Sequence, residues 1–177
     1  MTREQFDHVL RAAAAIAQED KLIGVGRQAV LLPHPLAPKE VLVSREVDLY
    51  PALHPERAEL IDGAIDALSS FDETFGSHAD GVGPDTAVMP ADGINHATLH
   101  HLGEVTAISP ELHDLAVSKC VPGRDKDADF VRALLRHKIE PTRLLQRIAV
   151  LDPARAAIDT MQAWARRRID GSGRATA

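Results

Sequence analysis

Residues 22–50 decide the fold of this chain: they read Leu22-Ile23-Gly24-Val25-Gly26-Arg27-Gln28-Ala29-Val30-Leu31-Leu32, then a proline-rich loop, then Val41-Leu42-Val43-Ser44-Arg45-Glu46-Val47-Asp48-Leu49-Tyr50. An apolar run meets two glycines, and a helix-like segment follows over residues 28–32. Strand alternation places Glu46 and Asp48 on one face, because side chains repeat every second residue. The stretch therefore predicts a strand, a glycine turn, a helix, and a second strand that carries an acidic pair.

The acidic pair and the glycine turn together suggest phosphate chemistry. Two neighbouring carboxylates repel each other unless a cation or a proton lies between them. Mg²⁺ takes one or two carboxylates and completes its shell with water and substrate phosphates, and a glycine turn that opens a helix offers backbone N–H groups to an anion. We expect Glu46 and Asp48 to bind Mg²⁺ and Gly26 to contact phosphate. The alternatives are a plain strand-to-helix turn at Gly24 and Gly26 and a solvated strand face on which Glu46 and Asp48 pair with Arg45 or Arg27.

Hydrophobic periodicity and turn residues predict the other elements. They predict helices over residues 2–20, 55–68, 109–121, 126–138, 141–151 and 153–168, strands over 21–25, 40–50, 78–82, 86–89, 96–102 and 104–108, and a connection over 69–76. This order is typical of an α+β fold in which a mixed sheet with flanking helices precedes a helical region. The expected domains are an α/β core over residues 1–108 and a C-terminal helical region over 109–177.

Composition excludes several functional classes. The chain has 177 residues, a formal net charge of −6 and 3% aromatic residues. A protein that coats nucleic acid would carry a basic face, and one that stacks bases would carry more aromatic side chains. The single Cys120 excludes an intrachain disulfide, and its apolar setting predicts a buried, inert thiol. No apolar run approaches the length of a membrane span and the N-terminus has no apolar signal core, so a cytoplasmic protein without membrane contact is expected.

Gly26-Arg27 and Glu46-Val47-Asp48 resemble the signature of the nucleotidyltransferase fold, the polymerase-beta-like superfamily. That signature is an apolar strand, Gly-Gly or Gly-Ser, a helix, and Asp-x-Asp or Asp-x-Glu on the next strand. The resemblance covers roughly residues 20–150, over which the chain looks like a bacterial nucleotidyltransferase-fold family of unknown function. The segments that carry it are residues 23–32, 43–51, 58–65, 71–76, 81–90, 113–119 and 123–135.

The helical half also resembles AbiEii-type toxins, which are nucleotidyltransferases of toxin–antitoxin and phage-defence systems with MNT-type antitoxin relatives. The matching residues are Lys119 and the set Arg124, Lys126 and Asp127. The resemblance implies that Lys119 and Lys126 contact nucleotide phosphates. The alternative is that these charges lie at exposed helix starts and pair with one another.

Two residues depart from the family pattern. Arg27 replaces the small residue after the glycine; it either binds a phosphate with its guanidinium fork or fills the pocket and pairs with the acids. Glu46 replaces the first Asp, and its extra methylene shifts the carboxylate, which Mg²⁺ geometry tolerates poorly. The third acid that would activate the attacking hydroxyl has three candidates on later segments, Asp80, Asp85 and Glu104.

Three functional hypotheses follow. In the first, the chain binds a nucleoside triphosphate and Mg²⁺ and transfers a nucleoside monophosphate to a hydroxyl of a protein, RNA or small molecule. Glu46 and Asp48 would be the catalytic and metal-binding residues, and the nucleotide-binding residues would be Gly26, Arg27, Gln28, Lys119 and Lys126. In the second, the domain is catalytically inactive and serves as a binding module, such as a toxin–antitoxin or defence-system partner. The third is a structural homodimer held by the apolar faces of the C-terminal helices.

Overall fold

The computed structural model describes residues 1–42 and 44–173, and in them it confirms the α+β fold. The chain divides into two compact units, which are described separately. The first comprises Met1–Thr86 with Ala97–Ser109, and the second comprises Ala87–His96 with Pro110–Ala177.

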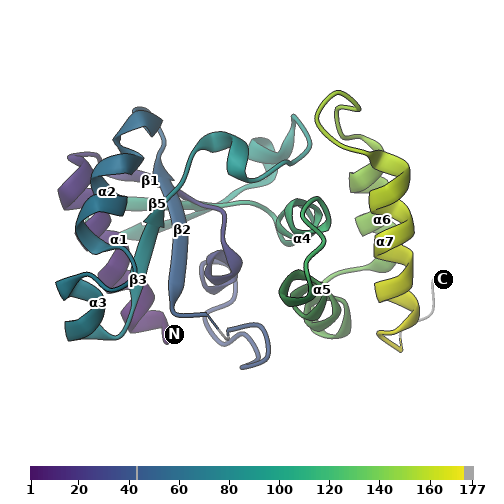
Figure 1. Cartoon of the computed structure of the whole chain (residues 1–177), viewed down its shortest axis with the longest axis horizontal. Helices are drawn as coiled ribbons and strands as arrows, with labels where there is room; N and C mark the ends of the chain where they lie inside the picture. Colours follow the sequence, from purple (N-terminus) through teal and green to yellow (C-terminus); the bar gives the residue numbers. More distant parts are fainter. Residues whose placement is uncertain (43, 174–177) are drawn as a thin grey trace. The chain divides into compact units, whose positions relative to one another are not determined.

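The first unit holds a five-stranded mixed sheet in the order β3-β2-β1-β5-β4 (Figure 1). Strand β1 pairs antiparallel with β2 and parallel with β5, β2 pairs parallel with β3, and β4 pairs antiparallel with β5. The elements of this unit are α1 (Arg3–Ala17), β1 (Lys21–Gly24), η1 (Arg27–Leu31), β2 (Glu46–Pro51), η2 (Pro55–Arg57), α2 (Ala58–Ile65), α3 (Ser70–Phe75), β3 (His78–Gly81), η3 (Pro84–Thr86), β4 (Thr98–Leu102) and β5 (Val105–Ser109).

Helices α1 and α2 cover one face of the sheet (Figure 1). The capping box predicted for α1 is present, since Gln5 N donates to Thr2 Oγ1 over 3.2 Å and Thr2 N donates to Gln5 Oε1 over 2.8 Å. In β2 the side chains of Val47 and Leu49 are buried beneath these helices, whereas Glu46, Asp48 and Tyr50 are half-buried. Strand alternation therefore puts the acidic pair on the face that α1 and α2 leave uncovered.

The second unit consists of η4 (Gly93–His96), α4 (Leu112–Cys120), α5 (Asp125–His137), α6 (Pro141–Ala149) and α7 (Ile158–Asp170). The predictions for α5 and α6 are confirmed, with Pro141 in the first turn of α6. Cys120 is buried as expected, and burial raises the pKa of its thiol to about 12. Within the described residues every helix is too short or too polar to serve as a membrane span.

Several predicted boundaries were wrong. The strand expected over residues 40–50 begins only at Glu46, because residues 38–42 form turns in which Val41 N donates to the Pro38 carbonyl over 2.9 Å. The connection expected over 69–76 contains α3, whose N-cap Ser69 accepts a hydrogen bond from Asp72 N. The helix expected after the glycine turn is the five-residue 3₁₀ helix η1.

The C-terminal half needs similar corrections. Residues 86–89 do not form the expected strand; Thr86 ends η3 and the chain then passes into the helical unit. Helix α4 begins at Leu112 with Glu111 as its cap, because Ser109 ends β5 and its hydroxyl donates to the Ala29 carbonyl over 3.1 Å. Helix α7 begins at Ile158, five residues after the predicted Pro153.

A close approach of α2 to β3 depends on Gly81. A Cβ atom at Gly81 would overlap the carbonyl oxygen of Ala58 and lie 2.7 Å from its carbonyl carbon. Backbone atoms cannot move aside as a flexible side chain can, so glycine is required where α2 crosses the strand.

We expect Gly81→Ala to destabilise the protein by about 2–3 kcal/mol, the upper range for overpacking a well-packed site. Gly63→Ala is the matched control, since a Cβ atom there has no neighbour within 4 Å. Alanine at this helical position should stabilise the fold by roughly 0.5–1 kcal/mol. Urea unfolding measures both, and equal midpoints for the two variants would contradict the packing interpretation.

In the second unit, Arg147 forms ion pairs with two aspartates from different segments. Arg147 on α6 donates to Asp114 on α4 through Nε at 2.6 Å and Nη2 at 2.8 Å, and to Asp92 through Nη1 at 3.0 Å and Nη2 at 2.8 Å. The Asp114 side chain is 1% exposed. The hydrogen bonds from Arg147 lower the pKa of the exposed Asp92 to about 2.

Arg147→Met should destabilise the protein by about 3–5 kcal/mol, because it leaves the Asp114 carboxylate buried without its partner. Arg143→Met is the control: that side chain is 51% exposed and lies 3.9 Å from Glu111. An exposed pair of this kind contributes about 0–1 kcal/mol. Chemical denaturation followed by circular dichroism would show a large shift for one variant and a small shift for the other.

Candidate metal and nucleotide site

Three carboxylates converge on the face of the sheet opposite α1 and α2. The parallel register of β2 and β3 pairs Asp48 with Asp80 and Glu46 with His78. Ligand oxygens of Glu46, Asp48 and Asp80 all lie within 4.8 Å of one another, and all three residues are half-buried. Three carboxylates this close form a set of hard oxygen donors of the kind that Mg²⁺ binds.

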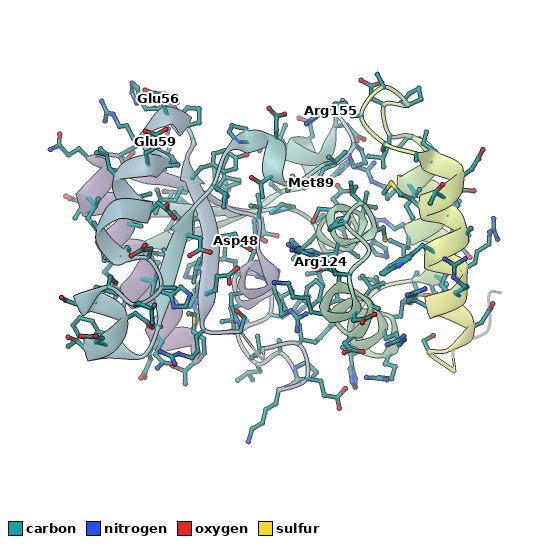
Figure 2. All side chains as sticks on the ribbon, viewed as in Figure 1. Asp48, Glu56, Glu59, Met89, Arg124 and Arg155 are labelled. Carbon is teal, nitrogen blue, oxygen red and sulfur yellow. The ribbon has the colours of Figure 1, made fainter. Side chains whose placement is uncertain are left out.

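The glycine turn lies directly against this cluster. The amides of Val25 and Gly26 donate to the main-chain carbonyl of Asp48 over 2.9 and 3.4 Å. A Cβ atom at Gly26 would overlap the Asp48 carboxylate, at 2.8 Å from its Cγ. Figure 2 shows Asp48 on β2. The predicted juxtaposition of turn and acidic pair is therefore present, and Gly26 is required because any side chain would displace the carboxylate.

Of the three candidates for a third acid, Asp80 is the one whose carboxylate lies beside those of Glu46 and Asp48. Burial, and after it the negative charge of Glu46, raise the pKa of Asp80 above its usual range. Asp85 lies in η3, where its charge adds to the effect of burial in raising the pKa of Tyr50. Glu104 lies in the exposed turn between β4 and β5. In the sequence, the alternation His78-Ala79-Asp80 indicates that Asp80 lies on the polar face of a strand. Its proximity to the other two acids depends on the pairing of β3 with β2.

Arg27 and Gln28 open η1, immediately after the turn. Arg27 is half-buried, and Gln28 is completely buried. Because η1 has five residues and the Val25 and Gly26 amides already donate to Asp48, the turn offers fewer free N–H groups than a full helix would. Phosphate binding at Gly26, Arg27 and Gln28 stays a prediction that would rest on the Arg27 side chain and the remaining amides of η1.

Gln28 has a positioning role that the sequence did not suggest. Its Nε2 donates to the Ser44 carbonyl over 2.6 Å, and the Ser44 hydroxyl accepts a hydrogen bond from the Glu46 amide at 3.1 Å. These two contacts tie η1 to the first residue of β2. The Oε1 atom of Gln28 is buried and has no hydrogen-bond partner among the described residues.

A histidine and an arginine border the cluster at the start of β2 and β3. Asp72 Oδ1 lies 3.1 Å from His78 Nδ1 and accepts a hydrogen bond from Arg45 Nη2 over 2.7 Å. The hydrogen bond with His78 lowers the pKa of Asp72, and the charge of Arg45 lowers it further. The alternative in which Arg45 pairs with the acidic pair is therefore not what the structure has, since this arginine binds Asp72.

Lys119 and Lys126 belong to the second unit. Lys119 lies in the last turn of α4 and Lys126 in the first turn of α5. Nearby, Arg124 Nε donates to Asp127 Oδ2 over 2.9 Å, so part of the predicted mutual pairing of these charges is present. A contact of either lysine with nucleotide phosphates stays a prediction.

The same chain was compared with known proteins. No family model, no curated protein and no solved structure matches it significantly.

Asp80→Asn should stabilise the protein in metal-free buffer at neutral pH. A carboxyl whose pKa is raised in the folded state binds its proton more tightly there, so stability is highest at low pH and falls as pH rises through the folded-state pKa. Asparagine removes this loss, and we expect a gain of roughly 0.5–1 kcal/mol, which is a rise in Tm of about 1–4 °C.

The control for this prediction is Glu104→Gln, an exposed acid outside the cluster. Its Tm should match that of the wild type at every pH. The difference between Asp80→Asn and wild type should shrink as the pH is lowered and the wild-type carboxyl becomes protonated. A constant difference between pH 4 and pH 8 would show that charge repulsion is not its cause.

Proposed function

We propose that this protein binds a nucleoside triphosphate with Mg²⁺ at Glu46 and Asp48, uses Asp80 as the base, and transfers a nucleoside monophosphate to a hydroxyl acceptor. The observation that carries the proposal is the convergence of three carboxylates within 4.8 Å. The contact of Asp48 with Gly26 adds to it, since it places a turn with little side-chain bulk beside the donors. A cytoplasmic location belongs to the same proposal.

Each residue has a defined task in this proposal. Glu46 and Asp48 would hold the cation, and Gln28 and Ser44 would keep the Glu46 end of β2 in place. Asp80, which pairs with Asp48 across the two strands, would accept the proton of the attacking hydroxyl. A bound Mg²⁺ would neutralise phosphate charge and orient the leaving group.

The acceptor is a hydroxyl of a protein, an RNA or a small molecule. The sixteen acidic and seven basic residues of the first unit disfavour a long nucleic acid that would lie along this surface. A protein hydroxyl, a small molecule or a single RNA end requires no such extended contact.

The second candidate function is an inactive nucleotidyltransferase-like binding module. It is favoured by Arg27, which directly follows the glycine that contacts Asp48. A guanidinium in the cation position would neutralise the acids permanently and remove the need for Mg²⁺.

Thermal unfolding with Mg²⁺ and each nucleoside triphosphate tests the first candidate. A ligand at one hundred times its Kd stabilises the folded state by about 2.7 kcal/mol, which for this chain length is a Tm rise of roughly 5–10 °C. Asp48→Asn should abolish the rise, whereas Glu104→Gln should retain it. The absence of any rise with wild-type protein would reject the nucleotide–metal site.

Arg27→Ser separates the two candidates. If the wild type binds Mg²⁺ and nucleotide, Arg27→Ser should weaken that binding or leave it unchanged. If Arg27 occupies the cation position, Arg27→Ser should create a Mg²⁺-dependent Tm rise that the wild type lacks. Transfer itself is measured as incorporation of label from an α-phosphate-labelled triphosphate, and it should be lost in Asp80→Asn.

A further inference from the structure

The segment from Pro55 to Phe75, which contains η2, α2 and α3, leaves large apolar side chains in solvent. Leu60 is 54% exposed, Leu68 is 87% exposed and Phe75 is 46% exposed. Between them α2 presents Gly63 and Ala64 to solvent. Helices α2 and α3 contact each other, and exposed apolar side chains on adjoining elements mark interaction sites in proteins. We call the outer surface of this segment the α2–α3 face.

Leu68 is costly for the fold. Its φ of 68° lies in the left-handed region, which costs an L-residue roughly 1–2 kcal/mol and favours glycine or asparagine. Its backbone N–H donates to Asp72 Oδ2 over 3.3 Å, and any residue except proline could make that bond. Because the Leu68 side chain is almost fully exposed, its burial within the described chain does not offset the free-energy cost of the left-handed backbone.

Phe75 is held rigidly at this face. Its ring lies 4.5 Å from the His8 ring and 4.8 Å from the Phe71 ring, centroid to centroid, and His8 stacks on Phe71 at 5.3 Å. These contacts cover part of the Phe75 side chain, which is still 46% exposed. A preorganised aromatic side chain loses little conformational entropy when a partner covers it.

The α2–α3 face is strongly acidic. Its acidic residues are Glu56, Glu59, Asp62, Asp66 and Glu73, and Figure 2 shows Glu56 and Glu59 at its upper end. The one basic residue of the segment, Arg57, is directed to the end of α1, where it donates to the carbonyls of Ala17 and Gln18 over 3.1 and 3.2 Å. This charge repels phosphates and anionic lipids and attracts lysine and arginine.

We propose that the α2–α3 face docks a basic amphipathic helix of a partner protein. Apolar residues of that helix would cover Leu60, Leu68 and Phe75, and Gly63 and Ala64 would let its backbone approach α2. Lysine and arginine residues on its flanks would pair with the acids around the apolar side chains, as in other helix-docking modes. The proposal is independent of the metal site.

A labelled model peptide tests the proposal directly. The probe is an 18-residue peptide of Leu, Ala and Lys with its apolar residues on one helical face, and fluorescence anisotropy measures its binding to the full chain. A scrambled peptide of the same composition should bind at least about tenfold more weakly, a difference of 1.4 kcal/mol. A peptide with Glu in place of Lys should not bind, and added salt should weaken the Lys peptide.

Variants of the protein locate the binding surface. Leu60→Ser should weaken peptide binding about tenfold, whereas Leu36→Ser should not change it, although Leu36 is 94% exposed. Glu59→Lys should weaken binding more than Glu104→Lys. Leu68→Gly should weaken binding while it raises the Tm, because glycine relieves the left-handed backbone; this excludes misfolding as the cause of the weaker binding.

Three results would overturn the proposal. The first is no binding of the Lys peptide, and the second is equal binding by wild type and Leu60→Ser. The third is self-association of the wild type in analytical ultracentrifugation that Leu60→Ser abolishes, since this would assign the face to a second copy of the chain. The Mg²⁺-dependent Tm rise should be unchanged in these variants, so the outcome does not depend on the proposed enzyme activity.

Discussion

The parallel pairing of β2 with β3 is the contact on which the candidate site depends. A parallel pair requires a crossover connection, and here the connection contains η2, α2 and α3. For α2 to pack on β3 the strand needs Gly81, because a side chain would strike the Ala58 carbonyl. The same pairing sets Asp48 beside Asp80, so one register determines both the packing on one face and the carboxylate cluster on the other.

The three carboxylates of the cluster repel one another, and packing of the sheet holds them together. Burial and the charge of Glu46 disfavour ionisation of Asp80, while buried Val47, Leu49 and Ala79 hold the two strands on α1 and α2. Apolar packing therefore stabilises an arrangement that its polar face opposes. A bound divalent cation would make the electrostatic energy of the three carboxylates favourable. Locally unfavourable groups are therefore expected at the places where proteins bind ligands.

The two exposed features of the first unit have different chemistry. The carboxylate cluster attracts a small cation through concentrated charge, whereas the α2–α3 face combines acids with apolar side chains and suits a larger, amphipathic partner. Both are built on the same crossover, and Asp62 of α2 and Asp66, which follows α2, also raise the pKa of Asp80 after burial and Glu46.

The sequence by itself determined the local features: the capped helix α1, the glycine turn, the alternation that puts Glu46 and Asp48 on one face, and the proline-started α6. These depend on residues within a few positions of each other, where periodicity and capping act. Only the tertiary structure selected Asp80 over Asp85 and Glu104, showed Gln28 bound to Ser44, and paired Arg147 with Asp92 and Asp114. Those relations join residues far apart in the chain, and strand register and helix packing, which local patterns do not encode, decide them.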